Sequence, residues 1–245
     1  MKVAMVGGTG FVGSYITDGL ISHNMVPRLL IREGSESKLL QPEKCEIVYG
    51  DLSHHHDRTS VPAILEVLEG CDAVIYNVGV IREFPSKGLT YEKLHFHAAK
   101  WCIDAAKELN ISRFILMSAN GVKKEGTGYQ NTKMLAEDYL KASGLDYTIF
   151  RPSLIFGDPR GGNRPEFCSQ LKKDMLSLPI PAPNFHKGLN PFNAGNFALS
   201  PIHVKDVAPY LIGSRPKINL LSIARTPFFS PENKPIDELL NDFKM

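Results

Sequence analysis

Tyr129 and Lys133 are the residues whose types and spacing point most directly to chemistry. The chain has eight tyrosines, and only Tyr129 is followed by a lysine four positions later. Residues four apart on a helix share one face, so both side chains can reach the same ligand. A free tyrosine has a pKa of about 10, and a neighbouring ammonium lowers it by favouring the phenolate. The pair is therefore a candidate for moving a proton to or from a substrate oxygen, and the alternative is an exposed pair on an amphipathic helix.

A glycine-rich segment near the start of the chain points to a phosphate-binding turn. Residues 7–13 read GGTGFVG, so Gly7, Gly10 and Gly13 follow a GxxGxxG spacing directly after a strand-like run and directly before a helical pattern. Such a turn is sharp, brings the backbone close to a pyrophosphate and packs the helix tightly on the strand. The helix N-terminus offers free N–H groups to phosphates. An ordinary tight turn is the alternative, and the context predicts that a dinucleotide binds here, on Gly7, Thr9, Gly10, Phe11, Val12 and Gly13.

The end of the second predicted strand bears on which dinucleotide binds. An acidic residue at this point holds the ribose hydroxyls of NAD, whereas an arginine accommodates the 2′-phosphate of NADP. The strand ends Leu30-Ile31-Arg32-Glu33, with Arg32 in the terminal position. We therefore expect NADP (NADPH), bound by Arg32. NAD stays possible, because Glu33 could serve a ribose if the register differs by one residue.

Short apolar runs alternate with longer segments of helical period over the first 150 residues. This alternation predicts an α/β fold, a doubly wound parallel sheet (Rossmann fold) with helices on both faces. The strands are apolar at nearly every position, as expected when both faces are covered. The predicted strands are Val3–Val6, Arg28–Ile31, Glu46–Tyr49, Ala73–Tyr76, Phe114–Met117 and Tyr147–Phe150, and the predicted helices are Phe11–Ser22, Val61–Leu68, Tyr91–Leu109 and Gln130–Lys141.

The rhythm changes at about Arg151, where prolines become frequent and Gly161-Gly162 adds a flexible point. Long regular elements are not expected in such a segment. We predict one domain over residues 1–245, in which residues 151–245 form a small C-terminal lobe that covers the substrate. Short helices are expected near Glu166–Asp174 and Val204–Ile212, and a further one near Ile236–Phe243.

Composition excludes several classes of function. The net charge is +2 and no basic cluster stands out, which argues against a nucleic-acid binder. No run of about 20 apolar residues, signal peptide or disulfide framework is apparent, so we expect a cytoplasmic location without an integral membrane segment. His54, His55 and His56 cannot easily converge on one ion, so no metal is expected. A small-molecule substrate is expected, and a protein partner or homo-oligomer stays open.

Several segments in order resemble the short-chain dehydrogenase/reductase superfamily, in its atypical and extended, epimerase/dehydratase-like branch. The resemblance runs over most of the chain and is best over residues 1–157. It is carried by GGTGFVG, Gly50-Asp51-Leu52, Asn77-Val78-Gly79, the strand ending in Ser118, the YxxxK motif from Tyr129 to Lys133, Arg151-Pro152 with Phe156-Gly157, and His203–Ala208.

The resemblance implies roles for individual residues. Ser118 would hydrogen-bond the substrate oxygen, Tyr129 would move its proton, and Lys133 would bind the nicotinamide ribose and lower the tyrosine pKa. Two departures stand out: the loop from Ser118 to Tyr129 is short, and His97 stands in the long helix where relatives carry Asn. We expect His97 to be a hydrogen-bonded interior histidine. The resemblance also implies cofactor contacts at Asp51, Leu52, Asn77, Val78, Gly79 and Pro152.

Three functions are compatible with these features. The first is an NADPH-dependent oxidoreductase that acts on a carbonyl or hydroxyl group of a small molecule through Ser118, Tyr129 and Lys133. The second is a dinucleotide-binding scaffold or assembly factor, since the resemblance extends to an accessory subunit of respiratory complex I and to photosystem assembly factors. A nucleotide-sugar epimerase or dehydratase is the third. The Tyr129–Lys133 pair favours the first, and the short loop and His97 favour the second.

Overall fold

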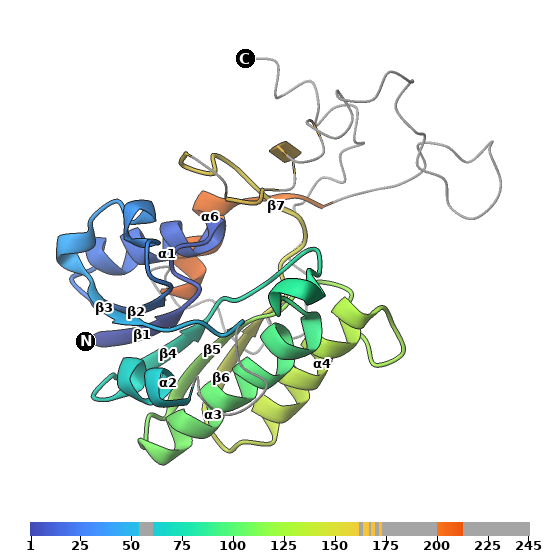
Figure 1. Cartoon of the computed structure of the whole chain (residues 1–245), viewed down its shortest axis with the longest axis horizontal. Helices are drawn as coiled ribbons and strands as arrows, with labels where there is room; N and C mark the ends of the chain where they lie inside the picture. Colours follow the sequence, from blue (N-terminus) through green and yellow to red (C-terminus); the bar gives the residue numbers. More distant parts are fainter. Residues whose placement is uncertain (54–60, 162–163, 167, 170–171, 173–199, 213–245) are drawn as a thin grey trace.

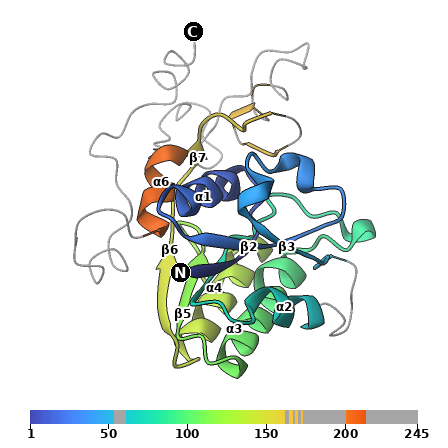
Figure 2. The same cartoon turned by 90° about the vertical axis from the view of Figure 1, so that its left-hand side faces the viewer.

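Six parallel strands form the centre of the computed structural model, in the order β3-β2-β1-β4-β5-β6 (Figures 1 and 2). The structure describes residues 1–53, 61–161, 164–166, 168–169, 172 and 200–212. The strand order reverses direction between β1 and β4, which is the topological switch point of a doubly wound sheet. The predicted Rossmann fold is thus confirmed, and ligands in such folds bind at the carboxyl ends of the strands beside the switch point.

The predicted strands and helices of the first 150 residues are found with small shifts at their ends. The strands of the sheet are β1 (Lys2–Val6), β2 (Val26–Ile31), β3 (Glu46–Tyr49), β4 (Ala73–Tyr76), β5 (Arg113–Met117) and β6 (Asp146–Phe150). The α-helices are α1 (Phe11–Ser22), α2 (Val61–Leu68), α3 (Ala98–Glu108), α4 (Gly128–Lys141) and α6 (Val204–Leu211). A π-helix, η5 (Glu92–His97), precedes α3, and a two-stranded parallel sheet pairs β7 (Ile155–Phe156) with β8 (Ile202–His203).

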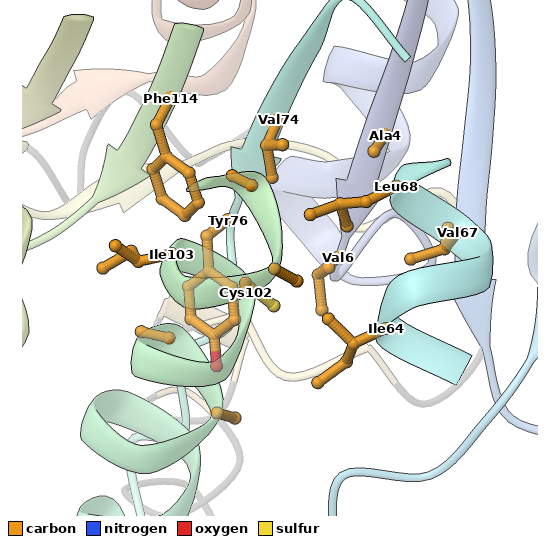
Figure 3. Close-up of a cluster of buried hydrophobic side chains, with 14 of the residues drawn as sticks. Ala4, Val6, Ile64, Val67, Leu68, Val74, Tyr76, Cys102, Ile103 and Phe114 are labelled. Atoms are coloured by element: carbon orange, nitrogen blue, oxygen red, sulfur yellow. The ribbon is translucent and has the colours of Figure 1, made fainter. Parts of the chain in front are cut away.

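Alternate residues of the strands supply two separate hydrophobic cores. Helices α2, α3 and α4 cover one face, where Val6, Tyr76 and Phe114 meet Ile64 and Ile103 (Figure 3). Helices α1 and α6 cover the other face (Figure 2). Because neighbouring strand residues point to opposite faces, each central strand must be apolar at every position. Because both faces of the sheet are buried, a ligand can approach the strands only at their ends.

Helix α6 differs from the sequence-based prediction, which assigned residues 204–212 to a lobe over the substrate. Val204, Val207 and Leu211 are buried in the same core as Ile16 and Leu20 of α1. The helix is therefore part of the layer that covers the sheet. Of the predicted helix near residues 166–174, Glu166 is not helical and residues 168, 169 and 172 are helical. Its other residues lie outside the described part of the chain, as do most of the predicted lobe, the helix at 236–243 and His54–His56.

The predicted long helix from Tyr91 to Leu109 contains the π-helical turn at its start. A π-turn holds one more residue than an α-helical turn, and such turns are frequent at functional sites. One added residue rotates the side chains that follow by about 100° relative to a regular helix. Both histidines of the segment, His95 and His97, lie within this π-helix.

Candidate active site

The turn between β1 and α1 is shaped for a ligand that approaches its backbone. A Cβ atom at Gly13 would lie 2.0 Å from the carbonyl oxygen of Gly7, so the packing of the turn itself requires glycine there. Among the described residues, a Cβ at Gly10 would meet only that same oxygen, at 3.4 Å, so this part of the chain leaves the space in front of Gly10 open. The first N–H groups of a helix have no intrahelical partner, and among the described residues no side chain of the N-cap position, Gly10, satisfies those of α1. These features fit a pyrophosphate.

A cavity of about 580 Å³ opens at the carboxyl ends of β2 and β3, a volume within the range of small-molecule sites. The exposed Arg32 contributes to its wall, and its contact with a 2′-phosphate stays a prediction. Asp51 accepts hydrogen bonds from the main chain and hydroxyl of Ser53 through Oδ1, while the neighbouring Leu52 is buried in the core. The cavity is lined by Arg32, Glu33, Ser35, Tyr49, Gly50 and Asp51.

The segment Asn77–Gly79 continues β4 at the switch point and lies against the glycine-rich turn. The Asn77 N–H donates to the Val6 carbonyl at 2.9 Å, and a Cβ at Gly7 would lie 2.6 Å from the Asn77 oxygen. The carboxyl ends of β1 and β4 are thus in contact, which brings the predicted residues Asn77, Val78 and Gly79 next to the phosphate-binding turn.

Helix α4 carries the Tyr129–Lys133 pair and begins two residues earlier than predicted. Thr127 caps it: its hydroxyl accepts from the Gln130 N–H, and the Gln130 side chain accepts from the Thr127 N–H. This T-x-x-Q capping box is readable in the sequence. It places Tyr129 in the first turn of α4, and the Lys133 ammonium lies 5.9 Å from the centre of the Tyr129 ring.

Lys133 is buried and held by main-chain oxygens at the ends of two strands. Its Nζ donates to the Met117 carbonyl at 3.1 Å and lies 3.4 Å from the Val78 carbonyl. Burial lowers the pKa of Lys133 to about 8, against the opposing attraction of the Glu137 carboxylate. A cation at the ends of β4 and β5 is where the resemblance expects one beside the nicotinamide ribose.

Tyr129 is half-buried in an aromatic cluster. Its ring packs edge-on against Tyr91 and His95, with centroids 5.6 and 5.1 Å away. Burial and the neighbouring Tyr91 raise the pKa of Tyr129 above its ordinary value. This differs from the expectation that Lys133 lowers that pKa, because desolvation disfavours the phenolate. Tyr129 is therefore a neutral O–H group at neutral pH.

His95 is a member of the site that sequence reasoning missed. It is 2% exposed and lies between Val80, whose N–H donates to its Nε2, and Thr132 of α4. The prediction of an interior His97 is wrong: its side chain is 44% exposed and lies 3.5 Å from the Glu92 carboxylate. Both histidines lie in the π-helix, and no periodicity in the sequence signals which of them is buried.

Ser118 is buried at the end of β5, and its hydroxyl donates to the Glu137 carboxylate at 2.6 Å. Arg151 donates to the same carboxylate through Nε at 2.8 Å and through Nη2. Burial raises the pKa of Glu137, but the bonds from Arg151 and Ser118 outweigh it and the net pKa is lowered. Ser118 can donate to a substrate oxygen only if its hydroxyl rotates away from Glu137, so its catalytic role stays a prediction.

The main chain of Pro152 helps to hold the ends of two neighbouring strands together. Its carbonyl accepts from the Asn120 N–H at 2.8 Å, as the Phe150 carbonyl accepts from the Ser118 N–H at 2.7 Å. These two bonds join the ends of β5 and β6. Among the described residues, no group of three His, Cys, Asp or Glu side chains is arranged to hold a metal ion.

Comparison with known families shows to which family the chain belongs. A family model described as NAD(P)H-binding matches residues 7–174, which is more than half of the chain. The chain belongs to the NAD(P)H-binding family. The resemblance to the epimerase-like branch of the short-chain dehydrogenase/reductases is thereby confirmed, and the matched segment includes every predicted site residue.

Relatives of this NAD(P)H-binding protein include both an assembly factor and a reductase. It is 29% identical over 152 residues to the photosystem II assembly factor Ycf39 of Cyanophora paradoxa, covering 62% of this chain and 44% of that one. It is 27% identical over 157 residues to a ceramide reductase of Caulobacter vibrioides, covering 63% and 46%. The chain thus spans less than half the length of these two relatives.

A solved structure supports the fold. The enzyme WbmH of Bordetella bronchiseptica, in complex with NAD+, superposes with a TM-score of 0.67 at 18% identity, covering 98% of this chain and 79% of that one. At this identity the likeness extends to the fold and not to the reaction. In the part of the chain that the structure describes, no helix has the length and apolar character that crossing a bilayer requires.

Proposed function

We propose that the protein is an NADP(H)-dependent reductase that converts a carbonyl group of a small molecule to a hydroxyl group, with Tyr129 as the proton donor. The observation that carries the proposal is the placement of Tyr129 beside the buried Lys133, whose ammonium bonds main-chain oxygens at the ends of β4 and β5. These strand ends adjoin the phosphate-binding turn, so the pair lies where a bound nicotinamide would be expected.

The bound dinucleotide would supply the hydride, and the side chains of this chain would supply orientation and the proton. Tyr129 would hydrogen-bond the substrate carbonyl oxygen and donate its phenolic proton as negative charge develops there. Lys133 would hydrogen-bond the nicotinamide-ribose hydroxyls and stabilise the phenolate left behind. Ser118 would add a second hydrogen bond to the substrate oxygen once its hydroxyl leaves Glu137.

The protonation state of Tyr129 favours the direction of reduction. Burial and Tyr91 hold its pKa above the ordinary value, so the neutral phenol is the form present at neutral pH. A neutral phenol can donate a proton at once, whereas oxidation of an alcohol would first require the phenolate. Reductases among the relatives agree with this direction: a ceramide reductase and a quinoline-oxide ketoreductase.

The preference for NADP(H) is proposed from Arg32. The exposed Arg32 follows directly after β2 and lines the cavity at the carboxyl ends of β2 and β3. A guanidinium binds a phosphate through paired N–H groups, and this position adjoins the adenosine ribose in Rossmann folds. Glu33 lines the same cavity and is the group that would favour NAD.

The decisive experiment replaces Tyr129 by Phe, with Tyr139→Phe as the matched control. Tyr139 lies on the same helix, and its hydroxyl donates to Asp104 on the far side from the site. We expect Tyr129→Phe to bind NADPH with unchanged Kd and to lose turnover about 100-fold or more on a carbonyl panel. Tyr139→Phe should retain turnover. Equal turnover of wild type and Tyr129→Phe would overturn the proposal.

A second candidate function is a dinucleotide-binding scaffold without turnover. The hydrogen bond from Ser118 to Glu137 favours it, because it removes one of the two expected donors to a substrate oxygen. The similarity to a photosystem II assembly factor points the same way. Tight NADPH binding by the wild type, with no carbonyl compound reduced, would select the scaffold.

A further inference from the structure

We propose that Arg164 is a phosphate-binding residue of the cofactor site, an inference that rests on the proposed dinucleotide binding. Arg164 comes from the proline-rich part of the chain, far in sequence from the glycine-rich turn. Its Nε donates to the Thr9 carbonyl at 3.1 Å, and its Nη2 donates to the Lys38 carbonyl. The guanidinium therefore joins the phosphate-binding turn to the loop that follows Arg32.

Among the described residues, no anion lies close to the charge of Arg164. The side chain is only 8% exposed, and its other contacts are Nη1 bonds to the carbonyls of Pro159 and Arg160 at 2.8 and 2.7 Å. Within the described residues no carboxylate lies within ion-pair distance of it. Burial lowers the pKa of Arg164, and the like charge of Arg160 lowers it further, against the attraction of Asp158 and Asp18.

A buried cation without an anion is unfavourable, and the neutral carbonyls offset only part of that cost. An arriving phosphate would supply the missing charge. The guanidinium has five N–H groups, of which the four carbonyls engage four, so one is left for a ligand.

The glycine-rich turn has no positively charged side chain of its own to bind a pyrophosphate. Residues 7–13 contain no basic side chain, so the main-chain N–H groups and the dipole of α1 are the turn's own means of binding a pyrophosphate. The neighbouring Arg160 is committed elsewhere: it pairs with Asp18 and lies 3.5 Å from the centre of the Tyr15 ring. Arg164 is therefore the cation placed to complete the turn.

Arg160 also provides the matched control. Both arginines fasten the segment from Asp158 to Glu166 to the first βα unit, Arg160 through α1 and Arg164 through Thr9. If Arg164 only fastens this segment, removing Arg160 should be as harmful as removing Arg164. If Arg164 binds phosphate, the two variants should differ in their affinity for ligands and in its dependence on salt.

The experiment measures NADPH and NADH binding by fluorescence titration at several salt concentrations for wild type, Arg164→Gln, Arg164→Lys and Arg160→Gln. We expect Arg164→Gln to weaken both dinucleotides about tenfold or more, because the pyrophosphate is common to them. Its affinity should depend less on salt, since one charge contact is lost. Arg164→Lys should keep the salt dependence, and Arg160→Gln should bind within about twofold of wild type.

Two results would overturn the inference. One is Arg164→Gln binding as tightly as wild type, and the other is Arg160→Gln losing as much affinity with an unchanged salt dependence. Should Arg164→Gln fail to fold, Arg164→Lys decides, because a phosphate contact predicts that it binds with the salt dependence of wild type. Failure of the wild type to bind either dinucleotide would instead refute the proposed function itself.

Discussion

The imidazole of His95 lies 3.2 Å from the hydroxyl of Thr132, and the two residues join the π-helix to α4. A main-chain N–H can only donate, so the Val80 N–H makes Nε2 of His95 an acceptor, which leaves the proton on Nδ1 facing Thr132. Thr132 in turn donates to the Gly128 carbonyl at 2.8 Å. One neutral ring thus connects the segment after β4 to the helix that carries Tyr129.

This arrangement predicts a pH dependence of stability. Burial and the nearby Lys133 lower the pKa of His95 to about 3 in the folded state, against about 6.5 in an unfolded chain. Below about pH 6.5 the unfolded chain takes up a proton that the folded protein does not, so stability falls by up to about 1.4 kcal/mol per pH unit down to the folded pKa. Above about pH 6.5 the term is absent.

Urea denaturation between about pH 7.5 and 5 would measure this term. His95→Gln should flatten the decline relative to wild type, whereas His97→Gln should follow the wild-type curve because His97 is partly exposed. Parallel curves for wild type and His95→Gln would contradict the neutral, buried state of His95.

The two glycines at the ends of the phosphate-binding turn should respond differently to alanine. Gly13→Ala should lower the free energy of unfolding by about 2–3 kcal/mol, because the new Cβ would overlap the Gly7 carbonyl. Gly10→Ala should cost about 1 kcal/mol or less, since Gly10 has a φ of −72° and open space. It should nevertheless weaken dinucleotide binding. Thermal unfolding of both variants checks the stabilities, and titration checks binding. A Gly10→Ala variant that binds the dinucleotide as tightly as wild type would refute a ligand in front of Gly10.

The affinities of the Arg32→Ala and Glu33→Ala variants for NADPH and NADH test the cofactor preference. Arg32→Ala should weaken NADPH about tenfold or more and leave NADH within about twofold, because only NADPH carries the 2′-phosphate. Glu33→Ala should leave both nearly unchanged. Comparable losses of NADPH and NADH in Arg32→Ala, or a selective loss of NADH in Glu33→Ala, would reverse the assignment to NADP.

The contact between Ser118 and Glu137 predicts an energetic coupling. Glu137→Gln should lower the free energy of unfolding by about 1–3 kcal/mol, because the bonds to the buried carboxylate lose their charge, while solvent screens the partly exposed Arg151 left behind. Ser118→Ala should cost about 1–2 kcal/mol by removing one bond to a buried carboxylate. Urea denaturation of the single and double variants measures the coupling, and we expect about 1 kcal/mol or more. Strictly additive losses would mean that the two side chains do not interact in solution.

The sheet and its helices could be predicted from the sequence because burial on both faces imposes continuous apolar strands, such as Ala73–Tyr76. The turn before α1 and the shared helix of Tyr129 and Lys133 could also be predicted, because both follow from local geometry, while their contacts with a cofactor stay predictions. Contacts between distant segments could not be predicted. The Ser118–Glu137 bond and the Thr9–Arg164 bond each depend on the tertiary fold, and the position of His95 depends on a π-turn that its local sequence does not signal.

Helix α6 completes the face of the sheet that α1 begins, although it comes from near the other end of the chain. On the ribosome, the apolar side of α1 emerges long before Val204 and Leu211 are made. The nascent chain must therefore keep Ile16 and Leu20 only partly covered until residues 204–211 leave the exit tunnel. A chain released before that point would expose the apolar side chains of Ile16 and Leu20 to chaperones and proteases. Premature termination between α4 and α6 should therefore yield a degraded product and no folded dinucleotide-binding domain.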